Sequence, residues 1–182
     1  MPALIIIRKE INMRVCIYAA ASDNIDKKYV TAVEKLSEDL AKSGHSLIYG
    51  GGASGLMGAA ARGFRKGNGE VIGVAPKFMD KFEPIFEDCT EIIRTETMAE
   101  RKKIMEDGCD AFIIVPGGIG TLDEFFQVLT LRELERHNKD IIIYNIDDFY
   151  TKLVDYIEDG IERGFIRPSV REYYRVVNIS TK

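Results

Sequence analysis

Short apolar runs alternate with longer amphipathic runs along the chain. The longer runs predict helices, because their apolar residues recur at the spacing of one helix face, and the short runs predict strands. The predicted strands cover residues 14–20, 46–49, 70–75, 91–94, 111–115 and 140–145, with 176–179 as a last strand or a docked tail. The predicted helices cover residues 26–43, 55–66, 98–107, 121–137 and 149–163. Residues 77–89 fit neither period, and Pro84 argues against a helix there.

The strand predicted at Ala111–Val115 (AFIIV) is apolar on both of its faces. Strands of this kind, alternating with helices, are typical of a parallel sheet that is covered on both sides and joined by right-handed crossovers. The sequence therefore predicts an α/β fold, a doubly wound Rossmann-like parallel sheet with helices on both faces, in a single domain. A chain of 182 residues is long enough for one such core.

The first residues precede this pattern. Met13 stands directly before the first predicted strand, so residues 1–13 are interpreted as an N-terminal extension and residues 14–182 as the nucleotide-binding domain. Leu4–Ile7 has strand composition and is an alternative edge strand. The order of the segment, apolar first and charged second, is the reverse of a secretory signal.

Composition and charge narrow the classes of partner. The net charge of −4 predicts no broad basic surface for nucleic acid. No apolar run approaches the roughly 20 residues that cross a bilayer, so no membrane partner is expected. Cys16, Cys89 and Cys109 form no CxxC pair, and His45 and His137 have no metal-ligand neighbours at a useful spacing. We therefore expect a cytoplasmic protein with reduced thiols and no metal.

Two glycine-rich loops leave predicted strands and enter predicted helices, which is where ligands bind in open α/β sheets. In the first loop, Gly50, Gly52 and Gly55 match G-x-G-x-x-G, a dinucleotide-binding pattern. The match follows the second strand rather than the first, and Lys77 lies near the place where a ribose-binding acid is expected. A dinucleotide site, a tight turn that packs the helix closely, and one wall of a smaller nucleotide site all stay open as interpretations.

The second loop, Pro116-Gly117-Gly118-Ile119-Gly120-Thr121, joins the strand AFIIV to a helix. Glycines let backbone N–H groups approach an anion, and the helix N-terminus adds a favourable dipole. No lysine follows the last glycine as in a Walker A loop, which disfavours triphosphate hydrolysis. The loop predicts a phosphate site, with the Thr121 hydroxyl capping the helix or contacting the phosphate. The alternative is a plain tight turn with Thr121 as its cap.

Charged residues are predicted on both sides of this phosphate site. Asp123 and Glu124 are placed in the first turn of the following helix, and Arg101 and Lys102 at the start of the preceding one. Such charges commonly serve only the helix dipole and solvation. A carboxylate beside a phosphate, however, needs a cation or a developing positive charge to offset it. We expect the two cations to balance the phosphate and hold the carboxylate.

Several segments of the chain together resemble one known family. PGGIGTLDE, YGGGASGLMGA and MAERKKIM, with the late stretch IIIYNIDDFYTKL, are similar to the Lonely Guy (LOG) family of cytokinin riboside 5'-monophosphate phosphoribohydrolases, often labelled lysine decarboxylase-like. The resemblance runs from about Arg14 to Ile166. It implies hydrolysis of the N-glycosidic bond of an adenine-type nucleoside 5'-monophosphate to the free base and ribose 5-phosphate, without a cofactor. It also implies a homodimer or a higher homo-oligomer.

The resemblance assigns roles to single residues. The catalytic pair falls on Arg101 and Glu124. Glu124 would stabilise the positive charge that builds on the sugar, and Arg101 would orient Glu124 or the leaving base. The implied substrate contacts are Glu83, Met98, Lys102, Gly117, Gly118, Ile119, Gly120, Thr121, Leu122, Asp123 and Thr130.

The chain departs from the family pattern in three places. Its first strand runs into Ala19-Ala20-Ala21-Ser22 where the family has a CGSS-like turn. Asp123 stands where Glu is usual, and LRELERHN replaces a WAQLGIH-like stretch. A non-catalytic nucleotide sensor of the same fold is therefore kept as the alternative function, and a dinucleotide-dependent oxidoreductase as a third.

Overall fold

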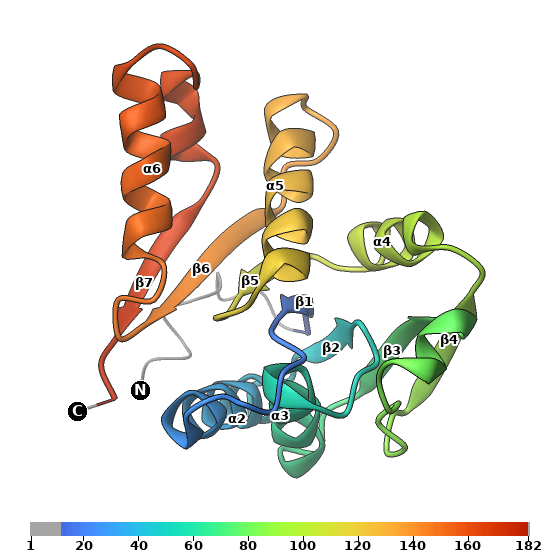
Figure 1. The fold of residues 1–182 in the computed structure, drawn as a ribbon. Helices are drawn as coiled ribbons and strands as arrows, with labels where there is room; N and C mark the ends of the chain where they lie inside the picture. Colours follow the sequence, from blue (N-terminus) through green and yellow to red (C-terminus); the bar gives the residue numbers. More distant parts are fainter. Residues whose placement is uncertain (1–11, 182) are drawn as a thin grey trace.

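The computed structural model describes residues 12–181, in which a sheet of seven strands carries helices on both sides (Figure 1). The strands are β1 (Arg14–Tyr18), β2 (Ser46–Tyr49), β3 (Val71–Pro76), β4 (Glu91–Thr95), β5 (Ala111–Ile114), β6 (Asp140–Ile146) and β7 (Arg175–Ile179). The helices are α2 (Lys27–Lys42), α3 (Gly55–Lys66), α4 (Met98–Asp107), α5 (Ile119–Glu133) and α6 (Thr151–Glu162). Two short 3-10 helices, η1 (Lys77–Lys81) and η2 (Pro168–Glu172), complete the elements.

The strand order places β1 at the centre of the sheet. The order is β4-β3-β2-β1-β5-β6-β7, and every neighbouring pair is parallel. The chain therefore winds outward from β1 to β4, crosses back over the sheet through α4, and winds outward again from β5. The winding direction reverses between β1 and β5, so the loops after these two strands diverge and leave a crevice. This topology confirms the predicted doubly wound α/β fold.

Successive residues of β1 face opposite layers, which explains its unbroken apolar sequence. Val15 and Ile17 pack in the core beneath α2 and α3, whereas Cys16 and Tyr18 pack in the core beneath α4, α5 and α6. Figure 1 shows α2 and α3 on one side of the sheet and the other three helices on the opposite side. Both faces of the strand are thus buried, as a sheet between two helical layers requires.

Most predicted elements appear with similar bounds, and β2, α3 and α4 have the predicted ones. The segment at 176–179 is a strand, part of β7, rather than a docked tail. Residues 77–89 are irregular apart from η1. The proposed edge strand Leu4–Ile7 lies outside the described residues, and the division at residue 13 stays a prediction.

Helix α5 corrects two predictions. It begins at Ile119 rather than Thr121 and takes Gly118 as its N-cap, so Thr121 is not the cap, and Asp123 and Glu124 lie in the second turn rather than the first. It ends at Glu133 rather than His137, and Glu135 soon after it has a left-handed backbone with φ of 58°. A left-handed residue does not continue an α-helix, so the chain turns there toward β6.

Two further findings concern residues 12–181 as a whole. None of their helices combines the length and the apolar character that crossing a bilayer demands. Within the same range, His, Cys, Asp and Glu side chains form no group of three or more that could hold a metal ion.

Candidate active site

A pocket of about 340 Å³ opens at the carboxyl ends of the strands, at the reversal point between β1 and β5. Its walls come from the loop after β1, the start of α3, the segment after β3, α4, and the start of α5. The lining residues are Ala19, Ala20, Ala21, Ser22, Met57, Met79, Glu83, Met98, Arg101, Gly118, Gly120, Thr121, Asp123 and Glu124. The fold thus brings the second glycine-rich loop, the start of the helix after the first one, and both predicted catalytic residues to one cavity.

The backbone of Ala20 ties the two glycine loops together. Its N–H donates to the carbonyl of Pro116 at 3.2 Å, before the second glycine loop. Its carbonyl accepts from the N–H groups of Leu56 and Met57, at 2.9 and 3.1 Å, after the first. The turn after β1 therefore holds the two sides of the pocket through main-chain atoms.

The start of α5 supplies free amide groups to the pocket. The helical bond nearest its start runs from the N–H of Leu122 to the carbonyl of Gly118, and no side chain within residues 12–181 caps the helix. The amides of residues 118–121 therefore have no partner within the helix and can bind an anion, which the helix dipole also favours. A Cβ at Gly118 or Gly120 would meet no heavy atom within 4 Å, so their backbone is open to a ligand.

Gly117 allows close packing within the same loop. A Cβ at this position would lie 2.1 Å from Oγ1 of Thr121, which is buried. The absence of a side chain lets Thr121 pack directly on the loop backbone, which fixes the turn that leads into α5.

Arg101 is held rigidly in the first turn of α4. A capping box places that turn: Thr97 accepts from the N–H of Glu100, and the Glu100 carboxylate accepts from the N–H of Thr97. The Arg101 guanidinium donates through Nε to the carbonyl of Val74 at 3.1 Å and through Nη2 to the carbonyl of Gly50 at 3.3 Å. These contacts orient a cation that is almost wholly buried.

Glu124 faces Arg101 across the pocket. Nη1 of Arg101 lies 3.8 Å from Oε1 of Glu124, and their side chains are only 8% and 12% exposed. Burial raises the pKa of Glu124 to about 7, and the charge of Arg101 opposes that rise. A carboxyl group with this pKa exchanges protons readily near neutral pH, which suits general acid–base work.

Two charged side chains pack against the glycines of the first loop, in the space that side chains at Gly50 and Gly52 would take. A Cβ at Gly50 would lie 1.8 Å from Nη2 of Arg101, and a Cβ at Gly52 would lie 2.0 Å from Oε1 of Glu83. Only glycine leaves room for both charged groups. The loop therefore packs against Arg101 and Glu83, two residues that line the pocket, and its role toward a ligand stays a prediction.

Backbone pairing places Glu83 beside this loop. Gly52 forms an isolated antiparallel bridge with Ile85, and the N–H of Ala53 donates to the carbonyl of Pro84 at 2.9 Å. Oε1 of Glu83 is buried and has no hydrogen-bond partner among the described residues. Burial raises the pKa of Glu83, although the charge of Arg101 opposes the shift. Glu83 thus lines the pocket with one carboxyl oxygen that no donor among the described residues satisfies.

The remaining predicted contacts lie at different depths. Lys102 pairs at 2.7 Å with Asp123, which lines the pocket, and Met98 lines the pocket with its sulfur 3.9 Å from Arg101 Nη1. Leu122 packs on the core beneath α5, whereas Ile119 is 84% exposed. Thr130 is exposed in a later turn of α5 and does not line the pocket. Their roles toward a substrate stay predictions.

Met57 and Met79 line the pocket without having been predicted to do so. Met57 stands in the GLMG run next to a glycine motif, which could have drawn attention to it. Met79 lies in the irregular segment after β3, where no pattern marks it.

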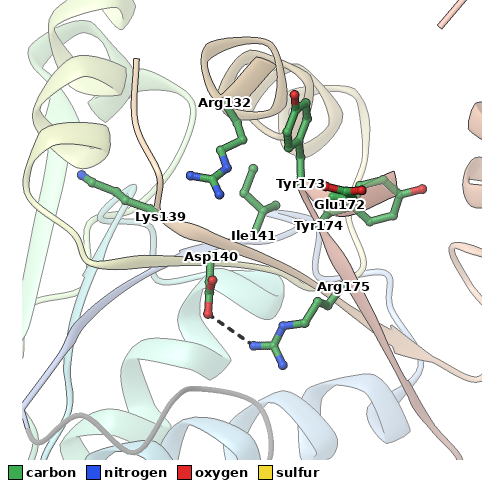
Figure 2. A pocket seen from close by; sticks show the side chains of 8 residues that line it. All are labelled: Arg132, Lys139, Asp140, Ile141, Glu172, Tyr173, Tyr174 and Arg175. Atoms are coloured by element: carbon green, nitrogen blue, oxygen red, sulfur yellow. Dashed lines mark ion pairs between the residues drawn. The ribbon is translucent and has the colours of Figure 1, made fainter. Parts of the chain in front are cut away.

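A second pocket, of about 300 Å³, lies at the amino ends of β6 and β7 (Figure 2). Both arginines of this pocket contact other groups of the protein. Arg175 pairs with Asp140 at 3.5 Å, and Arg132 donates to the carbonyl of His137 at 3.2 Å while its guanidinium lies over the Tyr173 ring. Because ligands of doubly wound folds bind at the carboxyl ends of the strands, this pocket is the weaker candidate.

Comparison with known proteins identifies relatives of the chain. A family model described as "Possible lysine decarboxylase" matches residues 57–182. A protein of Oryza sativa subsp. japonica named as a probable cytokinin riboside 5'-monophosphate phosphoribohydrolase is 38% identical over 158 residues, which cover 87% of this chain and 75% of the relative. An Arabidopsis thaliana protein named as a cytokinin riboside 5'-monophosphate phosphoribohydrolase is 36% identical, with 87% and 74% covered. The chain spans only 64% and 65% of the length of two further rice relatives.

Solved structures support the fold. The molybdenum cofactor carrier protein of Chlamydomonas reinhardtii superposes with a TM-score of 0.68 at 18% identity, covering 91% of this chain and 89% of that one. The molybdenum cofactor binding protein of Rippkaea orientalis superposes with a TM-score of 0.67 at 19% identity, covering 92% and 90%. At these identities the likeness concerns the fold alone.

The family match and the plant relatives, by contrast, confirm the resemblance seen in the sequence motifs: the chain belongs to the LOG family, whose model is described as possible lysine decarboxylase.

Proposed function

We propose that this protein hydrolyses the N-glycosidic bond of adenine-type nucleoside 5'-monophosphates, including cytokinin riboside 5'-monophosphates, and releases the free base and ribose 5-phosphate. The observation that carries the proposal is the buried pair of Arg101 and Glu124 beside the uncapped start of α5. The names of the plant relatives point to the same reaction.

The pocket offers each part of such a nucleotide a matching group. The free amides of residues 118–121 suit a phosphate monoester, and the Lys102 and Arg101 charges balance it. Glu83 has a free carboxyl oxygen for the ribose hydroxyls. With the phosphate on α5 and the hydroxyls on Glu83, the glycosidic carbon would lie near Glu124.

Glu124 would carry the chemistry. Cleavage of a glycosidic bond builds positive charge on the sugar ring, and an ionised carboxylate beside that carbon stabilises it. The same carboxylate can accept a proton from the water that attacks the carbon. Arg101 would hold the carboxylate in place, and the phosphate, bound away from the reacting atoms, would position the sugar.

Incubating the protein with a panel of nucleoside monophosphates tests the proposal. We expect free adenine and ribose 5-phosphate from AMP, and free base from its N6-prenylated form, detected by chromatography. The nucleosides without phosphate serve as controls and are expected to react far more slowly, because they lack the group that α5 binds. Nucleotide binding without any released base would instead support the non-catalytic sensor.

We also propose that the protein is at least a homodimer in which a second copy packs against α5. Exposed apolar side chains on and just after this helix, Ile119, Phe126 and Leu134, support this arrangement, and so does the exposure of Thr130. Light scattering is expected to give at least twice the mass of 20.5 kDa. Phe126→Glu should shift the protein toward the single chain, whereas Tyr156→Glu, an exposed aromatic residue on α6, should not. A single-chain mass in the unaltered protein would refute the dimer.

A cytoplasmic location is part of the same proposal. Cys16, Cys89 and Cys109 are free thiols, and two of them are buried. Unpaired thiols are typical of proteins in reducing compartments.

A further inference from the structure

Two opposite charges in the active-site pocket do not pair with each other. Glu83 and Arg101 both line the cavity, and the charge of Arg101 acts on the pKa of Glu83. Among the described residues, however, Arg101 forms its ion pair with Glu124, while Oε1 of Glu83 is buried without a hydrogen-bond partner. A buried carboxyl oxygen normally finds a donor. The missing partner therefore calls for an explanation in the side chains around Glu83.

The side chain of Met57 borders both charged groups. A Cβ at Gly50 would lie 1.8 Å from Nη2 of Arg101 and 2.6 Å from Cε of Met57. A Cβ at Gly52 would lie 2.0 Å from Oε1 of Glu83 and 3.2 Å from the same Cε. One methyl group thus lies close to both the guanidinium and the carboxyl group.

A main-chain hydrogen bond and core packing hold Met57 in this position. Its N–H donates to the carbonyl of Ala20 at 3.1 Å in the first turn of α3, and its side chain packs in the core beneath that helix. It is buried, with 7% of its surface exposed. A thioether methyl group offers neither a donor nor a strong acceptor, so it lies beside the two charged groups without satisfying either one.

We propose that Met57 is a positioning residue that holds Glu83 apart from Arg101, so that the Glu83 carboxyl group stays free for the hydroxyls of the sugar. This inference rests on the proposed function, because it uses the same placement of the nucleotide. It adds a basis for sugar specificity: the site selects ribose over 2-deoxyribose through a carboxyl group that Met57 keeps unpaired. Removal of the methyl group would let Glu83 pair with Arg101 and lose that selectivity.

The test measures dissociation constants for ribose 5-phosphate and 2-deoxyribose 5-phosphate, which carry no base and cannot be hydrolysed at that bond. Met57→Ala is expected to weaken ribose 5-phosphate binding about tenfold, the usual worth of a hydrogen bond to a charged group, and to leave 2-deoxyribose 5-phosphate nearly unchanged. Met57→Leu keeps the apolar volume and is the matched control, with the preference for ribose retained. Met57→Val, a smaller truncation, is expected to lie between them if Met57→Ala does not fold.

A double-variant cycle separates this role from simple packing. In a Glu83→Gln background, Met57→Ala is expected to cause no further loss of ribose preference, because glutamine cannot form the ion pair. Equal losses in both backgrounds, or an unchanged preference in Met57→Ala, would overturn the proposal. Since neither sugar phosphate reacts, these results stand apart from the base-release assay: absence of base release refutes the proposed reaction, whereas the sugar preference decides the role of Met57.

Discussion

Glu124→Gln is expected to lower turnover of a nucleoside monophosphate about a thousandfold, the usual effect of removing a charge that stabilises a transition state or a general base. Glutamine has nearly the shape of glutamate, so the nucleotide should bind with a similar dissociation constant. Steady-state kinetics gives the turnover, and calorimetry with AMP gives the affinity.

The matched control is Glu133→Gln at the far end of the same helix, where the carboxylate pairs with Arg167 at 3.6 Å near the surface. We expect that variant to keep normal turnover. Normal turnover in Glu124→Gln itself would remove Glu124 from the reaction.

Thermal unfolding of Glu124→Gln shows whether a loss of turnover could come from a loss of stability. Because burial raises the pKa of Glu124 from 4.5 to about 7, the folded state binds its proton more tightly than the unfolded state does. Stability from this group is therefore present below about pH 4.5 and is lost as the pH rises to about 7, with a difference of about 3 kcal/mol. Glutamine cannot ionise, so thermal unfolding at pH 8 should show Glu124→Gln to be no less stable than the unaltered protein.

Arg101→Ala is expected to lower kcat/KM about a hundredfold to a thousandfold, because it removes a buried, fixed cation from both the carboxylate and the phosphate. Arg101→Lys should recover only part of the loss, since an ammonium group cannot reach the Val74 and Gly50 carbonyls and Glu124 together. Lys103→Ala is the matched control on α4, where an exposed Lys103 pairs with Asp107. Wild-type kinetics in Arg101→Ala would exclude Arg101 from the site.

The pH dependence distinguishes a role of Arg101 in orienting Glu124 from a role in binding alone. In the proposed reaction the carboxylate is the active form, so activity of the unaltered protein should fall about tenfold per pH unit below a pKa of about 7. Arg101 lowers the pKa of Glu124, and in Arg101→Ala that pKa rises. The acid limb of the residual activity should therefore move to higher pH, and an unmoved limb would contradict the pairing.

Much of the fold follows from the sequence because its signals are local. The apolar run AFIIV and the helical spacing after it predict a buried parallel strand and its crossover without knowledge of distant residues. The start of α5 differs from the predicted one because Gly118 and Gly120 are poor helix formers, which favours a later start in the sequence pattern. Their lack of side chains leaves the loop backbone open toward the pocket, and the helix begins among them.

In the site, too, local sequence motifs reveal some residues, whereas others depend on contacts between distant segments. Arg101 and Glu124 were matched through motifs of the family, and the structure places them 3.8 Å apart. The contact between Glu83 and the first glycine loop depends on pairing between Gly52 and Ile85, which lie far apart in the chain and share no sequence pattern. The position of Met57 beside two charged groups likewise follows only from the packing of three separate segments.

The turn after β1 has a consequence for how this chain and its relatives diverge. Ala20 joins the two glycine loops through its N–H and carbonyl groups, which every residue except proline possesses. Side chains at positions 19–21 are thus free to be exchanged for other small ones over evolutionary time, and Ala19-Ala20-Ala21 can stand in place of a CGSS-like turn without dismantling the site. Gly50 and Gly52 cannot be exchanged in this way, because a side chain at either position would overlap with a charged group of the site.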